Sequence, residues 1–194
     1  MPDIILASKS KVRLHILNKN NVVCSAKPSN VDEDEIKVAM LSDGASPKDI
    51  SKNLAEIKAN KVSQNNLDKI VIGADSVIDL ENEIISKPKN RSEALEILKK
   101  LNGKTHYLIS SVCISKNGSM IWHYTDKAEL KMKTMTEDEL KLYLSKIEDD
   151  KLYAYNVYQI EGEGKNLFNS IKGDMDTIMG LPIKKIKEYL NNLT

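Results

Sequence analysis

The segment that follows the first apolar run of the chain contains residue types that bind phosphate groups. Ser8-Lys9-Ser10 comes after the strand-like run Ile4 to Ala7 and precedes a helical spacing of apolar residues. Unpaired backbone N–H groups at a helix N-terminus attract anions, and the hydroxyls of Ser8 and Ser10 add further donors. Arg13 offers a planar fork that matches phosphate oxygens. The alternative is that the serines only cap the helix, beside lysines that face the solvent.

A carboxylate stands at the end of the most apolar strand that the sequence predicts. Asp75 follows Ile70-Val71-Ile72 and two small residues, and three consecutive apolar residues indicate a strand buried on both faces. Ligands of open α/β sheets bind outside the carboxyl ends of such strands. Asp75 is therefore a candidate to hold a divalent ion or to orient a water molecule. A carboxylate that only caps a turn is the alternative.

Two lysines and one glutamate have settings that suit a polyphosphate and its ion. Lys58 lies within an amphipathic helical segment, and Lys87 precedes Pro88, which restricts the backbone before it to an extended form. Either ammonium group would neutralise phosphate charge, although each also fits an ordinary surface position. Glu33 lies in an acidic run and is a candidate to share a metal ion with Asp75, the alternative being that the run is only solvated.

Other catalytic patterns have little support in the sequence. His15, His106 and His123 do not have the spacing of metal ligands, and there is no Cys–His pair or nucleophile elbow. Gly103-Lys104-Thr105 is similar to the end of a P-loop, but Leu98 stands where that motif has its first glycine, and the helix precedes the strand. Neither covalent catalysis nor a P-loop is therefore predicted.

Strand-like and helix-like segments alternate along the chain and must position these groups. The predicted strands cover residues 4–7, 69–78, 107–115, 120–132 and 167–171. The predicted helices cover residues 11–18 and 36–41, and four more begin at Pro47 after the cap Ser46, at the cap Ser92, at Thr136 with Glu139 in a capping box, and at Pro182. Asn117-Gly118 is a strong hairpin signal, so an α/β fold with a mixed sheet is expected.

The composition suits one folded domain and argues against several kinds of partner. With 194 residues, 41% of them hydrophobic, we expect one domain over residues 1–194 that has room for two lobes around a cleft. The 29 basic and 28 acidic residues leave a net charge of +1, which is no footprint for a long nucleic acid. No apolar run approaches the roughly 20 residues of a membrane span, and no leader precedes the first strand. A cytoplasmic protein is expected, with Cys24 and Cys113 as free thiols.

Taken together, these segments resemble the Maf family of nucleotide pyrophosphatases over nearly the whole chain. The matching segments are Ile5 to Ser10 with Arg13, Val31-Asp32-Glu33, Leu54-Ala55 with Lys58-Ala59, Ile72 to Asp75, Lys87-Pro88, Leu101 to His106 and Gly180-Leu181-Pro182. Each segment is unspecific by itself, but their shared order and spacing are hard to obtain by chance.

The resemblance implies a fold, a reaction and a cofactor. The fold is a mixed, twisted sheet of the Maf/ITPase-like kind, flanked by helices, with two lobes around an active-site cleft and often a homodimer. The reaction is hydrolysis of a nucleoside triphosphate between the α and β phosphates, which gives a monophosphate and diphosphate and needs Mg²⁺ or Mn²⁺. A role in cleaning the nucleotide pool follows from this reaction.

The resemblance also implies roles for single residues. Asp75 is similar to the family's proton acceptor and metal-site carboxylate, and Glu33 is similar to its acidic partner at the metal. Lys58 and Lys87 complete the catalytic set and, with Ser8, Ser10 and Arg13, resemble the phosphate-binding set. A divalent ion lowers the pKa of bound water and offsets charge on the leaving diphosphate, so this combination suits the reaction.

The sequence departs from the commonest family pattern at several substrate-binding positions. The usual Ser-Pro-Arg-Arg is here Ser10-Lys11-Val12-Arg13, so Val12 stands in place of an arginine, and Lys11 would replace charge but not bidentate geometry. Ser76 stands where threonine or glutamine usually follows the active aspartate. Glu161-Gly162 stands where the branch that acts on dTTP and UTP has glutamine before glycine.

Glu161 bears on the choice of base. Glutamine offers a donor and an acceptor to thymine or uracil, whereas an ionised glutamate only accepts and so matches the N1–H and N2 amino edge of guanine. Glu161-Gly162 followed by Leu167-Phe168 resembles the branch that acts on 7-methyl-GTP, although that branch has an aromatic residue where Val12 stands. We expect 7-methyl-GTP as substrate, with a dTTP/UTP pyrophosphatase as the alternative.

An alternative from another functional class is a non-catalytic, nucleotide-binding regulator of cell division. The family takes its name from the inhibition of septum formation, and a fold does not determine a function. The joint presence of Asp75, Glu33, Lys58 and Lys87 favours the enzyme, because a protein that only binds nucleotide has less need of a metal-centred carboxylate.

Overall fold

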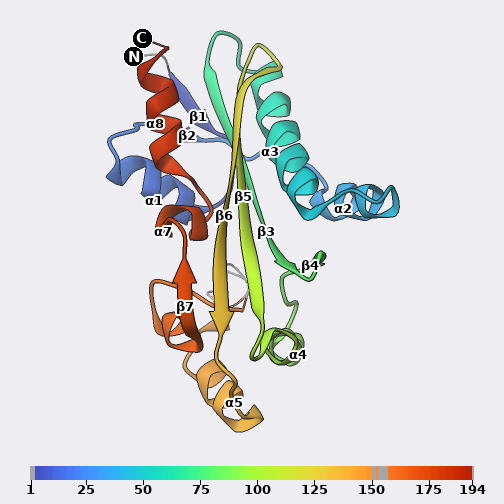
Figure 1. Ribbon diagram of the computed structural model, residues 1–194. Coiled ribbons are helices and arrows are strands. Elements are labelled where there is room, and N and C mark those ends of the chain that lie inside the picture. The colour runs from blue at the N-terminus through green and yellow to red at the C-terminus, as the bar shows by residue number, and fades with distance from the viewer. Residues whose placement is uncertain (1–2, 150–151, 153–156, 194) are drawn as a thin grey trace. The chain divides into compact units, whose positions relative to one another are not determined.

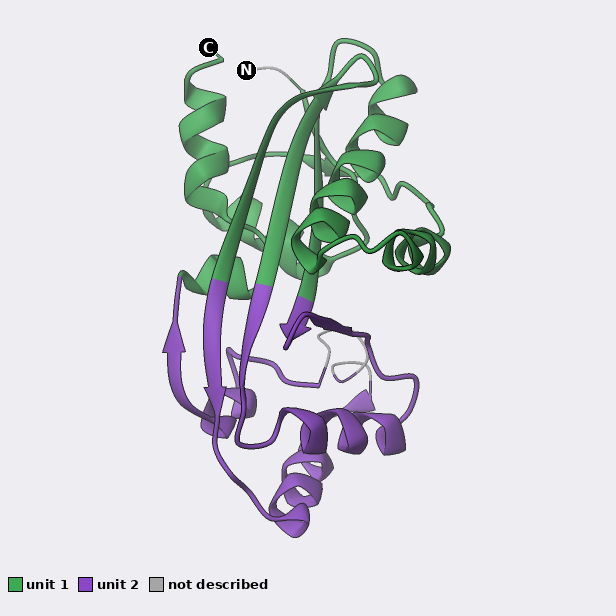
Figure 2. Cartoon of the chain, turned by 45° about the vertical axis from the view of Figure 1, so that its right-hand side comes forward, with its two compact units in different colours: residues 1–77, 109–127, 174–194 green, residues 78–108, 128–173 purple. Residues whose placement is uncertain are grey.

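The computed structural model describes residues 3–149, 152 and 157–193, and the chain divides into two compact units (Figure 2). The first unit consists of Met1–Val77, Ile109–Lys127 and Asp174–Thr194. The second unit consists of Ile78–Leu108 and Ala128–Gly173. One domain over residues 1–194, with a cleft between two lobes, stays a prediction.

The strands form one mixed sheet (Figure 1). They are β1 Ile4–Leu6, β2 Ser25–Ala26, β3 Ile70–Leu80, β4 Glu83–Ile85, β5 Thr105–Lys116, β6 Ser119–Met132 and β7 Phe168–Lys172. Their order is β2-β1-β3-β5-β6-β7, with β4 beside β3. β1 runs parallel to β2 and β3, whereas β4 is antiparallel to β3 and β7 is antiparallel to β6. The predicted mixed sheet is confirmed.

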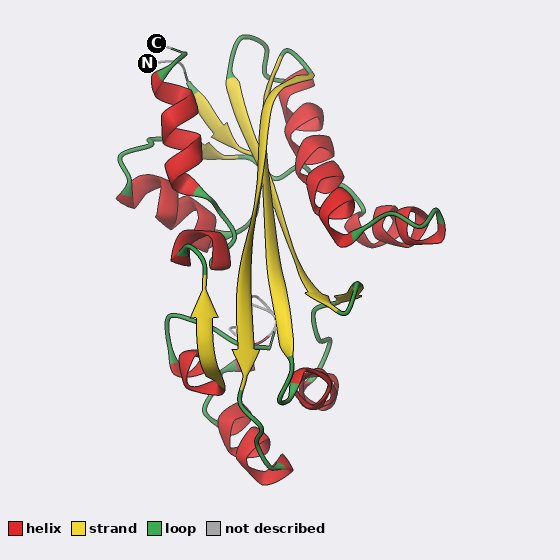
Figure 3. Cartoon of the chain, viewed as in Figure 1, coloured by secondary structure: helices red, strands yellow, loops and turns green. Residues whose placement is uncertain are grey.

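Helices separate and follow these strands along the chain (Figure 3). They are α1 Lys11–Lys19, α2 Glu33–Ser42, α3 Pro47–Gln64, α4 Arg91–Leu101, α5 Glu137–Ser145, α7 Met175–Ile178, α8 Ile183–Asn191 and the 3₁₀ helix η1 Glu163–Leu167. The prediction of an α/β class with a mixed sheet flanked by helices is therefore confirmed.

In the first unit, alternate residues of β3 face different helices. Ile70 and Ile72 pack in a cluster with residues of α1 and α8, whereas Val71 packs with Val62 of α3. This alternation follows from the two-residue period of a strand. It places Asp75 on the face of β3 that α3 covers.

Gly73 allows α3 to lie directly against β3. A Cβ atom at this position would be 2.2 Å from the carbonyl oxygen of Ala55 and 2.7 Å from the backbone nitrogen of Ala59. Only a glycine permits backbones to approach this closely. Because Lys58 lies between these two alanines in sequence, the close approach brings it next to Asp75.

The local signals in the sequence predict most element boundaries. Ser46 caps α3 before Pro47, and Thr136 forms the predicted capping box with Glu139 at the start of α5. Asn117 and Gly118 have φ angles of 52° and 81°, as a tight hairpin turn requires.

Several boundaries and short elements differ from the sequence prediction, among them the starts of α2 and α4 and the short helix α7. The Asp32 side chain accepts a hydrogen bond from the Glu35 backbone, so α2 begins at Glu33 and includes the acidic run as its first turn. Asn90 caps α4 by accepting from the Glu93 backbone, so the prediction that Ser92 is the cap was wrong. The four-residue α7 was not predicted, because it is too short to show helical periodicity.

The state of the two cysteines and the character of the described helices can be compared with the sequence predictions. Cys24 and Cys113 are both free thiols, and burial raises the pKa of Cys113 to about 12. In the part of the chain that the structure describes, no helix combines the length and apolar character that a bilayer crossing needs.

The second unit contains a fully buried histidine. The Nε2 atom of His106 lies 2.9 Å from the hydroxyl of Tyr158, and its ring contacts those of Tyr158 and Phe168 with centroids 5.7 and 5.8 Å away. Its Nδ1 atom has no hydrogen-bond partner among the described residues. Burial lowers the pKa of His106 to about 4 because the protonated form loses its hydration.

We expect His106 to make folding stability depend on pH. An unfolded histidine has a pKa of about 6.5, so as the pH falls from 6.5 towards 4 the unfolded state gains a proton that the folded state does not. The free energy of unfolding should then fall by on the order of 2 kcal/mol by pH 5 from this group. Urea unfolding of wild type and His106→Gln at pH 7 and pH 5 measures the difference.

The exposed His123 supplies the matched control for this measurement. His123→Gln should keep the pH dependence of the wild type, because folding leaves this side chain in contact with water. If His106→Gln kept the same pH dependence as His123→Gln, His106 would not be the group responsible.

Candidate active site

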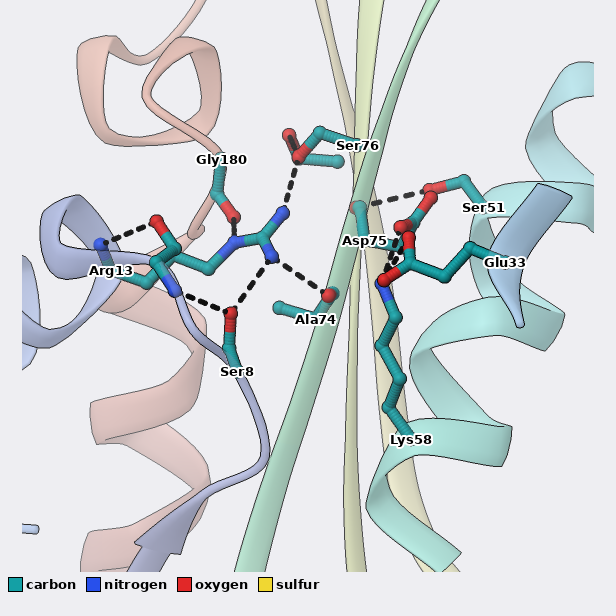
Figure 4. A network of polar contacts seen from close by, with 11 residues as sticks. Ser8, Arg13, Glu33, Ser51, Lys58, Ala74, Asp75, Ser76 and Gly180 are labelled. Carbon is teal, nitrogen blue, oxygen red and sulfur yellow. Dashed lines mark hydrogen bonds and ion pairs between the residues drawn. The ribbon is translucent and has the colours of Figure 1, made fainter. Parts of the chain in front are cut away.

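A buried ammonium group links two carboxylates in the first unit (Figure 4). The Nζ atom of Lys58, on α3, lies 2.8 Å from Asp75 Oδ1 on β3 and 2.8 Å from Glu33 Oε2 at the start of α2. Asp75 and Lys58 are almost fully buried, whereas the side chain of Glu33 is partly exposed. Three residues that the sequence proposed for catalysis therefore lie together.

The position of Glu33 favours its ionised form. Burial alone raises the pKa of Glu33, but the nearby ammonium of Lys58, with smaller contributions from Lys37 and Arg13, outweighs burial and lowers that pKa below its usual value. Glu33 is also the first residue of α2, where the helix dipole stabilises a negative charge. The site thus holds two carboxylates around one cation.

One carboxylate oxygen of Asp75 is left without a partner. Lys58 donates to Oδ1, and Ser51 donates to the backbone carbonyl, but Oδ2 is buried and accepts no hydrogen bond from the described residues. A buried, unsatisfied acceptor is costly unless a ligand or water completes it. Asp75 therefore has an oxygen available to accept a proton or to bind a cation.

The donor set fits a magnesium or manganese ion. These ions prefer oxygen ligands, and Mg²⁺ is commonly held by one or two carboxylates that leave other positions to water and substrate phosphates. Asp75 and Glu33 supply such a pair, and Asp75 has the unsatisfied oxygen. The described residues contain no group of three or more His, Cys, Asp or Glu residues that could hold a metal.

Both serines of the predicted phosphate loop take part in the start of α1. Ser10 is the N-cap, and its hydroxyl accepts from the backbone N–H of Arg13 at 3.3 Å. The hydroxyl of Ser8 accepts from the backbone of Ser10 at 3.1 Å. The capping interpretation is thus confirmed for Ser10. A hydroxyl that accepts can also donate its proton, so phosphate binding by these serines stays a prediction.

The side chain of Arg13 is bonded to four groups of the protein. Nε donates to the Gly180 carbonyl at 2.9 Å, one terminal nitrogen donates to the Ala74 carbonyl at 2.9 Å and to Ser8 Oγ at 3.4 Å, and the other donates to Ser76 Oγ at 3.1 Å. Burial lowers the pKa of Arg13, while the charges of Asp75 and Glu33 act to raise it. A phosphate group would have to compete with these partners.

The polar contacts of Arg13 and those of Asp75 lie on opposite faces of β3. Figure 4 shows Arg13 and Ser76 on one side of the strand, and Asp75, Lys58 and Glu33 on the other. This follows from the alternation of side chains along a strand.

The remaining predicted site residues have other surroundings. Val12 is partly buried and packs against the apolar cluster of the first unit, so its side chain contributes to the core. Lys87 and Glu161 are exposed residues of the second unit, and their roles at the site stay predictions.

Two serines of the site were not identified from the sequence. Ser110 Oγ lies 2.8 Å from Ser76 Oγ, and Ser51 donates to the backbone carbonyl of Asp75. The carbonyl of Gly180, which the sequence indicated only as part of a family segment, accepts from Arg13. Serines inside apolar segments are the signal that was available, because a buried hydroxyl needs a partner.

Sequence comparisons place the chain in a known protein family. The profile of the Maf family, described as Maf-like protein, matches residues 3–193. The chain belongs to the Maf family.

Named relatives cover almost the full chain. A "Nucleoside triphosphate pyrophosphatase" of Pelagibacter ubique (strain HTCC1062) is 68% identical over 97% of this chain and 96% of its own length. A protein of Ruegeria sp. (strain TM1040) with the same name is 37% identical over 96% and 94%. A "7-methyl-GTP pyrophosphatase" of Rhizobium etli (strain ATCC 51251 / DSM 11541 / JCM 21823 / NBRC 15573 / CFN 42) is 34% identical over 99% and 96%.

Proposed function

We propose that the chain is a pyrophosphatase that hydrolyses nucleoside triphosphates to a nucleoside monophosphate and diphosphate. The observation that carries the proposal is the unsatisfied Oδ2 of Asp75, buried beside the ammonium of Lys58 and the carboxylate of Glu33. The names of relatives that match along nearly the whole chain support the same reaction.

The roles of these residues follow from their chemistry. Asp75 accepts the proton of the attacking water, for which its unsatisfied oxygen is suited. Lys58 neutralises negative charge on the phosphates and keeps the two carboxylates together. Asp75 and Glu33 would hold Mg²⁺ or Mn²⁺, which when bound lowers the pKa of water and offsets charge on the diphosphate.

We propose 7-methyl-GTP as the substrate. Relatives named for this activity are 34–36% identical to the chain, while the 68% identical relative has the general name. The carboxylate of Glu161 supports the choice because it accepts from the guanine edge and attracts a cationic base. The dTTP/UTP activity is the second candidate within the family.

We expect Glu161→Gln to shift the substrate ranking towards dTTP and UTP. The amide supplies a donor that the carboxylate lacks, and one pair of base-edge hydrogen bonds discriminates by on the order of tenfold or more. The ratio of kcat/KM for 7-methyl-GTP to that for UTP measures the change. Glu163→Gln, at an exposed position nearby, is the control and should keep the wild-type ratio. An unchanged ratio in Glu161→Gln would remove Glu161 from base selection.

Diphosphate release from a panel of triphosphates tests the proposed function. The panel contains the common ribo- and deoxyribonucleotides and 7-methyl-GTP, each with Mg²⁺, with Mn²⁺ and with a chelator. Release that requires a divalent ion supports the enzyme, and the best substrate identifies the base. Nucleotide binding without release from any substrate would instead support the regulator of cell division. The homodimer, the cytoplasmic location and the role in nucleotide-pool cleaning remain parts of this proposal.

A further inference from the structure

Arg13 connects three segments that are far apart in the sequence. Its guanidinium group binds Ser8 in the loop after β1, Ala74 and Ser76 in β3, and Gly180 in the turn after α7 (Figure 4). All of these residues belong to the first unit. One side chain therefore holds the loop, the strand and the turn at fixed distances from one another.

The geometry of the guanidinium group makes this connection specific. An arginine side chain has five N–H donors in a rigid plane, and the four hydrogen bonds of Arg13 use all three of its nitrogens. A lysine has three donors on a single atom and cannot reach acceptors that lie around a plane. The arrangement thus depends on the shape of the group as well as on its charge.

The turn at Gly180 is built around this arginine. Gly180 has a φ angle of +95°, and a Cβ atom there would lie 3.0 Å from Ser76 Oγ and 3.4 Å from two guanidinium nitrogens of Arg13. A side chain at this position is therefore disfavoured both by the backbone and by the available space. This gives a physical role to the segment Gly180-Leu181-Pro182, which the proposed function does not otherwise use.

Two serine hydroxyl groups connect Arg13 to the helix α7 as well. Ser110 Oγ donates to the Thr177 carbonyl at 2.8 Å and lies 2.8 Å from Ser76 Oγ. Because the proton of Ser110 is used by Thr177, Ser76 must donate to Ser110, and Ser76 then accepts from Arg13. Hydrogen bonds thus lead from Arg13 through Ser76 and Ser110 back to the helix that precedes Gly180.

Asp75 lies between the two β3 residues that Arg13 binds. Its neighbours Ala74 and Ser76 are both hydrogen-bonded to the guanidinium group, although Asp75 itself points to the opposite face. Any shift of Arg13 would therefore move the backbone of Asp75 relative to Lys58. The hydroxyl of Ser8 would lose its connection to β3 through Arg13 at the same time.

From this geometry we infer that Arg13 is a positioning residue, which fixes the strand segment of Asp75 and the Ser8 loop and does not grip the substrate phosphates. Ser76 and Gly180 belong to the same hydrogen-bond network. The inference about activity rests on the proposed function, whereas the inference about the network itself does not.

Three substitutions test the inference through the separation of kcat from KM. Arg13→Lys and Gly180→Ala should each lower kcat by on the order of 100-fold, and Ser76→Ala should lower it by about tenfold, because misplacement of a catalytic group by about 1 Å has effects of this size. In all three variants KM should stay within about threefold of the wild-type value. A direct phosphate ligand would instead give a large rise in KM in Arg13→Lys alone. Normal kcat in Gly180→Ala and Ser76→Ala would overturn the inference.

A matched glycine variant and a double variant complete the experiment. Gly44 also has a positive φ angle, of 76°, but a Cβ there would meet nothing within 4 Å, so Gly44→Ala should keep wild-type kcat. In the double variant Arg13→Lys/Ser76→Ala the loss should be close to that of Arg13→Lys alone, since both residues act in one network. Losses that multiply would contradict a shared network.

Hydrogen exchange separates this inference from the proposed function. The backbone N–H of Leu181 donates to Asp176 at 2.8 Å, and this bond is part of the turn at Gly180. Ser76→Ala removes a single hydroxyl, so it is the variant of choice if the others do not fold. Faster exchange at Leu181 in Ser76→Ala than in Gly44→Ala supports the network even if no triphosphate is cleaved. Unchanged exchange would overturn it.

Discussion

Asp75→Asn should lower kcat for triphosphate cleavage by about 1,000-fold or more while the protein still folds. A positioned general base contributes on the order of 10²- to 10⁴-fold to a rate, and an amide cannot accept the proton of the attacking water. The substitution also removes the unsatisfied carboxylate oxygen that is suited to a divalent ion. Diphosphate release at saturating substrate and metal measures the loss, and circular dichroism checks the fold.

Asp68 provides the control for this prediction. It is an exposed aspartate before β3 with a φ angle of 61°, a conformation that asparagine also adopts readily. Asp68→Asn should therefore keep both activity and stability. If Asp75→Asn stayed within a few-fold of wild type, Asp75 would have no part in proton transfer or metal binding.

The second large effect is expected at Lys58. Lys58→Met leaves the buried carboxylate of Asp75 without its ion-pair partner, and removal of one member of a buried pair destabilises proteins by roughly 3–5 kcal/mol. Activity should be lost as well, since the ammonium group that neutralises phosphate charge beside Asp75 and Glu33 would be absent. Urea unfolding at neutral pH measures the free energy of unfolding.

The double variant Lys58→Met/Asp75→Asn distinguishes the ion pair from simple packing. It replaces the buried pair by groups without charge, so it should recover much of the lost stability but none of the activity. Lys48→Met, at an exposed position of the same helix, should change the stability by no more than about 0.5 kcal/mol. If Lys58→Met were as stable as Lys48→Met, the contacts of Lys58 would contribute little to folding.

Several features of the fold were predictable because neighbouring residues decide them. The apolar run 70–72 indicated a strand buried on both faces, and the structure confirms this for β3. The Thr136 capping box and the Asn117-Gly118 turn depend on residues at most three apart. The cap of α4 shows the limit of this approach, since Ser92 and Asn90 both suit a cap and only the observed hydrogen bond distinguishes them.

The candidate site was predictable only as a set of residue types. Asp75, Glu33 and Lys58 have charges that suit a polyphosphate and its ion, and the order of the family segments indicated that they act together. Their contact arises from the close packing of α3 against Gly73. Composition and periodicity do not predict this packing.

The sequence by itself therefore determined the class of fold, most of its local boundaries and the kind of chemistry that its charged residues suit. Only the tertiary structure decided what Arg13 binds, because its acceptors Ala74 and Gly180 lie 61 and 167 residues away along the chain. The physical reason is that capping and strand burial depend on neighbouring residues, whereas the environment of a side chain depends on which distant backbones pack around it.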